Sequence, residues 1–242
     1  MSGIKKVRAD LLLVEHGLAE SRHQAAALIL AGRVWTSSGR VEKAGQLLDP
    51  AVPLTFEEGE QFVSRGGLKL NSALDHFQIN PNGFVCLDSG ASTGGFTDCL
   101  LQRGTKKIYA VDVGHGQLHP KLREDPRVVV LEKTNLRHLT ALHEKIDLAV
   151  LDLSFISLTK VLEKVCTLLK EGGHLLALVK PQFELSPKEV KKGVVRDEAL
   201  REKAVQRVMD HAKGLGMTVR GRVDSSLPGP KGNREIFLWL NK

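Results

Sequence analysis

The chain has little cysteine and no long hydrophobic run. Three cysteines among 242 residues, Cys86, Cys99 and Cys166, form no CxxC pair, so neither a disulfide framework nor a thiolate zinc site is expected. Apolar runs such as residues 175–179 are far shorter than the roughly 20 residues that span a bilayer. The N-terminus contains no secretion-type apolar core. These absences argue against a membrane-spanning, disulfide-rich or exported protein and favour the reducing cytoplasm.

Aromatic residues are also scarce, whereas positive charge is plentiful. Phe, Trp and Tyr make up 5% of the chain, so base stacking should contribute little to any nucleic-acid binding. The formal net charge of +7 favours a polyanionic partner. Residues 1–64 carry seven Lys/Arg against eight Asp/Glu, whereas residues 180–234 carry thirteen against seven. A phosphate backbone is therefore expected to pass over the C-terminal part of the chain.

Residues 1–64 are expected to form a small α+β module of their own. Apolar residues at helical spacing in 9–14 and 24–30 predict two helices, the second with Ser21 as its N-cap. Apolar and polar residues alternate between glycines and prolines in 34–56, which predicts short strands joined by turns.

Residues 65–242 are expected to form one α/β domain. Apolar strand-like runs alternate with helical segments, which predicts a parallel, doubly wound, Rossmann-like sheet. Strands are expected at 84–87, 108–111, 128–131, 146–153 and 175–179, and helices at 97–103, 136–143, 158–169 and 197–213. Two last runs, 217–223 and 235–240, predict a terminal antiparallel pair.

A glycine-rich turn follows the first strand of this domain. The segment from Asp88 to Phe96 reads D-S-G-A-S-T-G-G-F and leads from a strand into a helix. Its glycines let a ligand approach the backbone, and a helix N-terminus favours negative groups. Asp112 ends the next strand, where an acid accepts hydrogen bonds from ribose hydroxyls. This pattern is typical of a nucleoside site.

Three interpretations of the turn compete. A dinucleotide-binding G-x-G-x-x-G loop is disfavoured because Ser92 occupies its second glycine position. A hydrolase elbow, G-x-S-x-G, matches Gly90 to Gly94 but needs a later acid and histidine, an order that nine histidines supply easily by chance. In the third interpretation the turn binds S-adenosylmethionine, and Asp88 stands near its cationic methionine end, where it would repel a pyrophosphate.

Two further strands end in residues suited to catalysis. The run 149–151 ends in Asp152, and 175–179 ends in Lys180. Ligands bind at the carboxyl ends of parallel strands, so both side chains are expected beside the nucleoside turn. Each alone is consistent with a solvated strand end. Together they indicate chemistry, because desolvation lowers the pKa of a lysine and lets it act as a base that a carboxylate orients.

Four motifs resemble those of the haemolysin A family. They are D-S-G-A-S-T-G-G-F-T-D from Asp88, D-L-S-F-I-S-L from Asp152, K-P-Q-F-E from Lys180, and G-P-K-G-N-R-E ending at Glu235. That family comprises ribosomal RNA ribose 2'-O-methyltransferases with the FtsJ-like fold, and the resemblance spans essentially the whole chain. It implies a Lys-Asp-Lys-Glu catalytic tetrad of Lys69, Asp152, Lys180 and Glu235. In this tetrad Lys180 deprotonates or polarises the ribose hydroxyl, Asp152 orients Lys180, and the other two residues position the ribose.

The resemblance also implies a cofactor and RNA contacts. The cofactor is S-adenosylmethionine, and no metal is expected in the absence of a His/Cys ligand cluster. The residues expected to bind the cofactor are Asp88, Ser89, Gly90, Ser92, Gly94, Gly95, Asp112 and Asn135, the last of which is equally consistent with an N-cap. The N-terminal module resembles an RNA-binding domain named after a small-subunit ribosomal protein, although Ser37-Ser38 replaces the usual Asn-Gly of one turn. RNA contacts are expected from Arg8, Arg22, Arg33, Arg65, Lys191, Lys192 and Arg234, with ribosomal RNA or ribosomal subunits as the partner.

Two other classes of function stay open at this point. A cytolysin is suggested by the family's name, and the missing signal peptide and membrane segment count against it. A non-catalytic ribosome assembly factor would use the nucleoside only as a structural ligand, and the intact tetrad argues against it. The sequence leaves the oligomeric state open.

Overall fold

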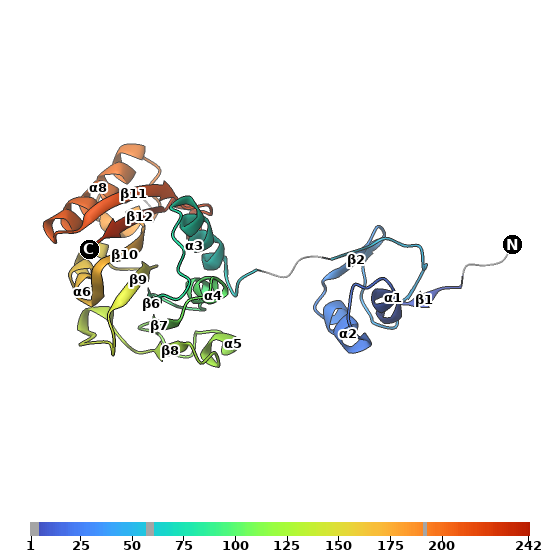
Figure 1. Cartoon of the computed structure of the whole chain (residues 1–242). Helices are drawn as coiled ribbons and strands as arrows, with labels where there is room; N and C mark the ends of the chain where they lie inside the picture. The colour runs from blue at the N-terminus through green and yellow to red at the C-terminus, as the bar shows by residue number, and fades with distance from the viewer. Residues whose placement is uncertain (1–4, 57–60, 191–192) are drawn as a thin grey trace. The chain divides into compact units, whose positions relative to one another are not determined.

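The structure of the chain divides into two compact units, Met1–Gln61 and Phe62–Lys242. It is a computed structural model that describes residues 5–56, 61–190 and 193–242 (Figure 1). The boundary between the units lies three residues before the one expected after residue 64.

The described residues of the N-terminal unit form two helices and five short strands. These are β1 (Val7–Arg8), α1 (Ala9–Glu15), α2 (Arg22–Leu30), β2 (Val34–Thr36), β3 (Gly39–Arg40), β4 (Leu47–Leu48) and β5 (Leu54–Phe56). Strand β1 pairs with β4, and β2 lies between β3 and β5. Both expected helices are present, and the Ser21 hydroxyl accepts a hydrogen bond from the backbone N–H of Gln24 at 3.2 Å, as an N-cap does. Leu12, Leu13 and Ile29 from the two helices pack together in its core.

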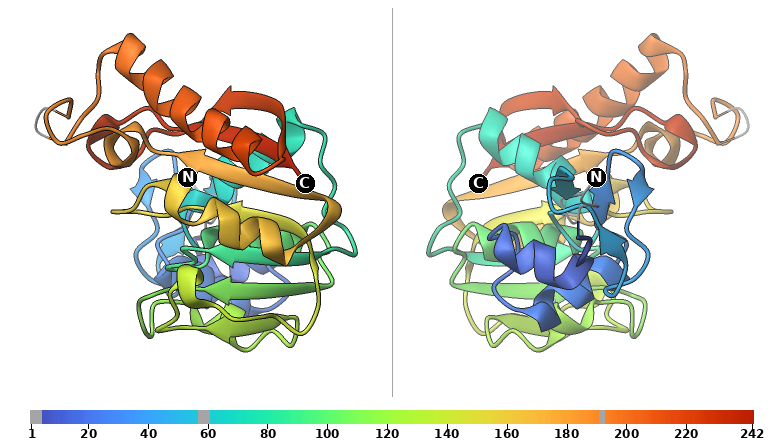
Figure 2. Two further views of the ribbon diagram at one scale, coloured as in Figure 1. Left: turned by 90° about the vertical axis from the view of Figure 1, so that its left-hand side faces the viewer. Right: turned by 90° about the vertical axis from the view of Figure 1, so that its right-hand side faces the viewer.

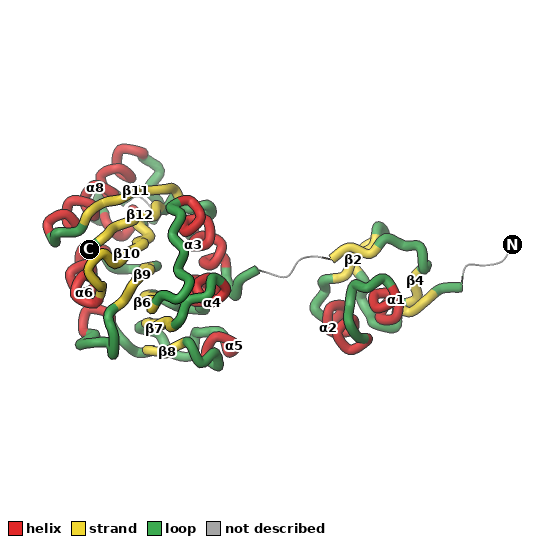
Figure 3. The backbone as a smooth tube through the Cα atoms, in the orientation of Figure 1, coloured by secondary structure: helices red, strands yellow, loops and turns green. Residues whose placement is uncertain are grey.

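The second unit is built on a seven-stranded sheet (Figure 3). Its strands are β6 (Val85–Ser89), β7 (Lys107–Val111), β8 (Val128–Leu131), β9 (Ile146–Leu151), β10 (Leu169–Val179), β11 (Thr218–Asp224) and β12 (Ile236–Asn241). Their order is β11-β12-β10-β9-β6-β7-β8. The five strands from β10 to β8 are parallel, whereas β12 is antiparallel to both of its neighbours. The expected parallel sheet with a terminal antiparallel pair is confirmed.

Helices cover both faces of this sheet because its strands are apolar on both sides. The helices are α3 (Arg65–His76), α4 (Gly95–Gln102), α5 (Pro120–Arg123), α6 (Leu162–Leu168), α7 (Pro181–Glu184) and α8 (Glu198–Gly214), with short 3-10 helices η1 (Leu136–His138), η2 (Leu158–Lys160) and η3 (Pro230–Gly232). In β6, Cys86 faces the core under α3, α4 and α5, whereas Leu87 faces the core under α6 and α8. Figure 2, left, shows α6 and α8 in front of the sheet, with α3 behind it.

The strand order reverses between β6 and β9, and this reversal positions the site. Strand β7 follows β6 on one side, while the chain crosses to β9 on the other side. The loops after β6 and β9 therefore leave the same edge of the sheet in opposite directions and open a crevice between them. The backbone N–H of Asp152 donates to the carbonyl of Ser89 at 3.0 Å, so the two loop starts are held together.

One expected helix is absent, and one helix of the structure was not expected. The helix expected at 136–143 was wrong: only η1 forms, and the backbone is already extended at Leu139. Helix α3 was not expected, since Gly66 and Gly67 disfavour a helix start. Tertiary packing explains the glycine at this helix start: a Cβ at Gly67 would lie 2.2 Å from the ring of Phe62, so only glycine fits there.

Candidate active site

The turn between β6 and α4 is tightly wound. Gly90, Ser92 and Gly94 all have left-handed φ angles, of +84°, +48° and +99°. A Cβ at Gly90 would lie 2.5 Å from the carbonyl oxygen of Asp152, which requires glycine at this position. The backbone of the turn therefore packs directly against the backbone at the end of β9, next to Asp152.

A first cavity of about 490 Å³ opens beside this turn. Five of the eight residues expected to bind the cofactor line it, namely Ser89, Gly90, Ser92, Asp112 and Asn135. The tetrad residue Asp152 lines it too, together with apolar side chains of Val111, Leu136, Leu153 and Ile156. The cavity thus combines a close backbone approach with a few polar groups and an apolar wall, as nucleoside sites do.

Asp112 and Asn135 have defined hydrogen bonds at the cavity wall. The Asp112 carboxylate accepts the backbone N–H groups of Ser92 at 2.8 Å and Gly114 at 2.7 Å. Each of its oxygens keeps a further lone pair, which suits a vicinal diol. The Asn135 side chain accepts the N–H of Arg137 at 3.1 Å, so it is an N-cap as well as a lining residue.

Three residues expected to touch the cofactor do not line the first cavity as the structure describes it. Asp88 is fully buried, and its carboxylate accepts a 2.6 Å hydrogen bond from Thr97. Burial raises the pKa of Asp88 to about 7, although the Thr97 hydrogen bond opposes this. Gly94 faces Leu118 and Leu122, and Gly95 faces Ser64 and Gly67 of the α3 start. These three residues pack behind or beside the turn, and their contact with the cofactor stays a prediction.

A second cavity of about 360 Å³ adjoins the first, since Ser154 and Phe155 line both. Its wall includes two members of the predicted tetrad, Lys180 and Glu235. The other residues that line it are Gln182, Phe183, Val190, Gly193, Lys231 and Asn233.

The structure brings the four predicted tetrad residues together as two ion pairs. Lys69 of α3 lies 2.6 Å from Glu235, which precedes β12. Lys180 at the end of β10 lies 2.5 Å from Asp152 at the end of β9 and donates to the Ser154 hydroxyl at 3.0 Å. The Lys180 contact is an ion pair without hydrogen-bond geometry, so Oδ1 of Asp152 has no hydrogen-bond partner in the described part of the chain.

The Lys69–Glu235 pair is buried, with 10% and 0% of the side chains exposed. A Cβ at Gly229 would lie 2.1 Å from Oε1 of Glu235, so the preceding loop closes tightly over this carboxylate. Oε1 itself is buried with no hydrogen-bond partner among the described residues. A buried acceptor without a donor, at the wall of a cavity, is suited to receive a hydroxyl from a ligand.

Several residues of the second cavity were missed by the sequence analysis. Phe155 has a left-handed φ of +64° and is 91% exposed. Its ring centroid lies 5.2 Å from that of Phe183. The only sequence signal was the position of both phenylalanines within the motifs that begin at Asp152 and Lys180. Low aromatic content suggested little stacking, yet two of the few aromatic side chains stand at this site.

The expected RNA-binding residues are spread over both units. Arg8 and Arg22 are exposed and share Asp10, whose pKa the Arg8 hydrogen bonds hold well below its usual range. Arg33 is half-buried. Arg65 is exposed, with a 3.5 Å contact to the Pro228 carbonyl, and Arg234 is exposed. Lys191 and Lys192 lie outside the described residues.

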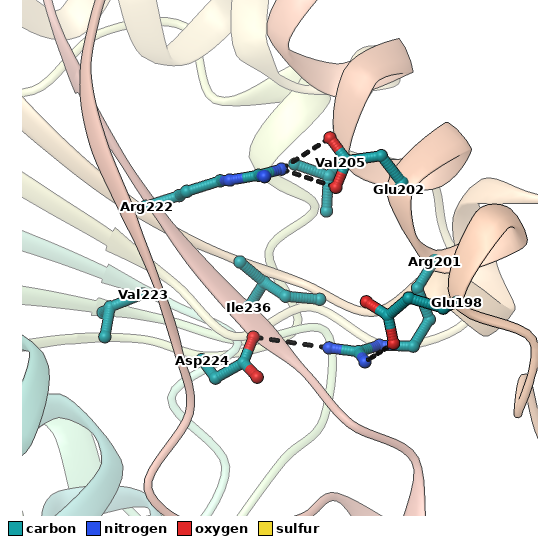
Figure 4. Close-up of a pocket in the computed structure, with 8 residues that line it drawn as sticks. All are labelled: Glu198, Arg201, Glu202, Val205, Arg222, Val223, Asp224 and Ile236. Carbon is teal, nitrogen blue, oxygen red and sulfur yellow. Dashed lines mark hydrogen bonds and ion pairs between the residues drawn. The ribbon is translucent and has the colours of Figure 1, made fainter.

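Many basic side chains of the C-terminal part are paired with acids. Between α8 and β11, Arg222 donates to both oxygens of Glu202 at 2.7 Å. Arg201 lies between Glu198 and Asp224 in the same small pocket (Figure 4). The expected basic track over residues 180–234 is therefore partly neutralised within the protein.

The described ranges contain no helix long and apolar enough to cross a membrane. They also contain no group of three His, Cys, Asp or Glu side chains arranged to hold a metal ion.

Comparisons with known proteins identify the family. A 16S/23S rRNA (cytidine-2'-O)-methyltransferase, TlyA of Mycobacterium tuberculosis, is 47% identical over 241 residues, which cover 98% of this chain and 90% of the relative. Hemolysin A of Brachyspira hyodysenteriae is 39% identical over 235 residues, covering 96% and 98%. The structure of a candidate hemolysin from Streptococcus thermophilus superposes with a TM-score of 0.74 at 39% identity, covering 99% and 90%. Residues 62–242 match the family model described as FtsJ-like methyltransferase. These matches confirm the family expected from the motifs, and the chain belongs to the FtsJ-like methyltransferases.

Proposed function

We propose that the protein transfers a methyl group from S-adenosylmethionine to a ribose 2'-hydroxyl of ribosomal RNA. The observation that carries this proposal is the placement of two ion pairs, Lys69–Glu235 and Lys180–Asp152, at two adjoining cavities: Asp152 lines the first, and Lys180 and Glu235 line the second. Ribosomal RNA as the substrate rests on the Mycobacterium tuberculosis relative, which carries that activity in its name. Because ribosomes are the proposed substrate, we infer that the reaction takes place in the cytoplasm.

The first cavity suits the cofactor. When bound, S-adenosylmethionine supplies a methyl group already activated on a sulfonium. Gly90 lines this cavity, and its missing Cβ lets the turn lie directly against the Asp152 carbonyl. Asp112 offers acceptor lone pairs for the ribose hydroxyls, and Asn135 stands at the same wall. Asp88, buried behind the turn, favours a positive charge in front of it.

The second cavity suits the acceptor ribose. Asp152 lines the first cavity and its ion-pair partner Lys180 lines the second, so a hydroxyl placed beside this pair also lies next to the cofactor. Lys180 donates a hydrogen bond to the hydroxyl oxygen and stabilises the negative charge that develops on it. The hydroxyl proton passes to the Asp152–Lys180 pair. The buried Oε1 of Glu235 accepts a second ribose hydroxyl, and Lys69 fixes that carboxylate.

The chemistry requires alignment more than activation. The oxygen of the ribose forms a bond to the methyl carbon as the carbon–sulfur bond breaks, and the sulfur leaves as a neutral thioether. Because the leaving group is already cationic, the protein's part is to hold the two partners in line and remove one proton.

The test uses ribosomal subunits and radiolabelled S-adenosylmethionine. A 2'-O-methyl ribose blocks alkaline cleavage of the next phosphodiester bond, so label should appear in alkali-resistant dinucleotides. Label in mononucleotides would instead mean base methylation, and no label at all would contradict the proposed activity. Lys180→Met should reduce incorporation at least 100-fold while cofactor binding, measured by calorimetry, is retained. Lys213→Ala, an exposed lysine at the opposite edge of the sheet, is the matched control.

A further inference from the structure

An additional concave surface of about 600 Å³ adjoins the second cavity. Six of the residues that line it carry a positive charge, an aromatic ring or an amide, and together they are called the outer pocket: Arg137, Phe155, Lys160, Gln182, Phe183 and Arg207. They come from η1, the loop after β9, η2, α7 and α8. None of its three cations was among the expected RNA-binding residues.

The outer pocket is continuous with the second cavity. Phe155, Gln182 and Phe183 line both, so this group forms the rim between them. Oε1 of Gln182 is buried and has no hydrogen-bond partner in the described part of the chain. A polymer whose ribose occupies the second cavity must therefore cross the Phe155–Phe183 pair to leave it on this side.

The outer pocket carries unneutralised positive charge. Arg137 and Lys160 are exposed, and neither forms an ion pair with any described residue. The Arg207 guanidinium donates to the backbone carbonyl of Glu184 at 2.6 Å and forms no ion pair with a carboxylate of the described residues. This differs from the α8–β11 pocket of Figure 4, where both arginines are paired with carboxylates.

Glu184 is the one carboxylate that lines this surface among the residues described, and it is turned inward. It is 2% exposed and accepts hydrogen bonds from the Ser157 hydroxyl at 2.5 Å and the Leu158 N–H at 2.8 Å. Burial raises the pKa of Glu184, against the opposing effect of these hydrogen bonds. The Arg207 charge also lowers this pKa, so the Glu184 carboxylate partly compensates Arg207 and leaves Arg137 and Lys160 as the unpaired cations of this surface.

An exposed aromatic ring beside unpaired cations is suited to bind one nucleotide of a single-stranded nucleic acid. The cations take the phosphate, and the ring stacks on the base. We propose that the outer pocket binds the RNA nucleotide adjoining the methylated one, with its phosphate on Arg137 and Lys160 and its base against Phe155. This inference rests on the proposed function, since it extends the acceptor strand from the second cavity. It also requires the RNA to be unpaired there, because a base inside a duplex offers no free face to Phe155.

The test compares two double variants in RNA binding. Arg137→Ala/Lys160→Ala removes the proposed phosphate contacts. Lys106→Ala/Lys213→Ala removes two exposed lysines at the opposite, amino edge of the sheet. The probe is a fluorescent single-stranded RNA 12-mer of mixed sequence, and anisotropy gives its Kd over a range of salt concentrations. The outer-pocket variant should bind about 10- to 30-fold more weakly near 0.15 M salt, with the salt slope reduced by roughly 1.4–1.8. The control should match the wild-type protein.

Phe155→Ala separates stacking from charge. It should weaken binding of the single strand about tenfold without changing the salt slope, and it should leave binding of a duplex of the same sequence unchanged. Equal losses in both double variants would mean diffuse electrostatic attraction and would overturn the outer pocket. So would wild-type affinity in Arg137→Ala/Lys160→Ala. Binding of the 12-mer is read without methylation, so failure of the proposed activity would appear separately, as absent label in ribosomal RNA.

Discussion

The buried Lys69–Glu235 pair allows stability and catalysis to be separated. Glu235→Gln keeps the shape of the side chain and removes its charge, and Lys69→Met keeps an apolar stem of similar length. Each single variant leaves one charge buried without its partner, at a place where the side chains are only 10% and 0% exposed. The double variant removes both charges and with them both desolvation costs.

The expected magnitudes follow from this burial. Breaking a buried ion pair by removing one partner costs about 3–5 kcal/mol, whereas replacing both partners by neutral groups is often close to neutral. The single variants should therefore each lower the free energy of unfolding by about 3 kcal/mol or more, and the double variant by less than about 2 kcal/mol. The double-mutant cycle then gives a coupling energy of at least about 4 kcal/mol.

The assay must report on the second unit alone. The chain has two tryptophans, Trp35 in the N-terminal unit and Trp239 in β12 of the second unit. In a Trp35→Phe background, urea unfolding followed by tryptophan fluorescence therefore reports on the sheet that carries Glu235. Methyl transfer to ribosomal subunits is measured on the same samples.

Stability and activity should diverge in the double variant. It should fold nearly as well as the parent and yet transfer methyl groups at least 100-fold more slowly, because the ribose has lost its carboxylate acceptor and the lysine that fixes it. Additive destabilisation in the double variant would refute the ion pair as the dominant interaction. A stable and fully active double variant would refute its role in catalysis and leave the pair as a structural one.

Two further predictions concern the turn after β6. The folded pKa of Asp88, about 7, exceeds its usual value near 4, so the folded chain holds a proton more tightly than the unfolded chain and stability falls as pH rises from about 4 to 7. Asp88→Asn should flatten that dependence and raise the free energy of unfolding at pH 8 by about 1–3 kcal/mol, and an unchanged pH profile of Tm would contradict it. Gly90→Ala should destabilise by about 2–4 kcal/mol and weaken cofactor binding in calorimetry, because its Cβ meets the Asp152 carbonyl. The control Gly83→Ala, which has a similar φ but open space, should lose only about 1–2 kcal/mol and keep the cofactor.

The fold was predictable from the sequence because the period and length of the apolar runs indicated which segments form strands and which form helices. Every strand of the large sheet was expected within a few residues except β10, which begins at Leu169, six residues earlier than expected. A bulge between Leu169 and His174 lets that strand start among glycines and charged residues. Such an irregular start leaves no alternating or continuous apolar pattern to detect.

The candidate site was predictable where it depends on strand ends. The carboxyl ends of parallel strands share one edge, so Asp152 and Lys180 had to lie near the turn after β6. Lys69 and Glu235 came from the family motif, because nothing in local sequence shows that a helix start and an antiparallel strand will meet. Phe155 was missed for a different reason. Its importance lies in exposure and in a left-handed backbone, and neither property leaves a periodic signal.

Counting basic residues does not show which of them the fold pairs with acids. The excess of basic residues in 180–234 pointed to that segment as the RNA track, but Arg201, Lys203 and Arg222 each lie within 3.3 Å of a carboxylate oxygen. A cation already paired releases no counterion when a phosphate arrives, so it adds little to binding or to its salt dependence. Arg137 and Lys160 come from stretches with no notable charge, yet they stand unpaired beside the second cavity. RNA affinity should therefore depend on the basic side chains near the reacting ribose that the fold leaves unpaired. Two alanine substitutions in the outer pocket should lower RNA affinity more than two among the paired residues of α8 and β11.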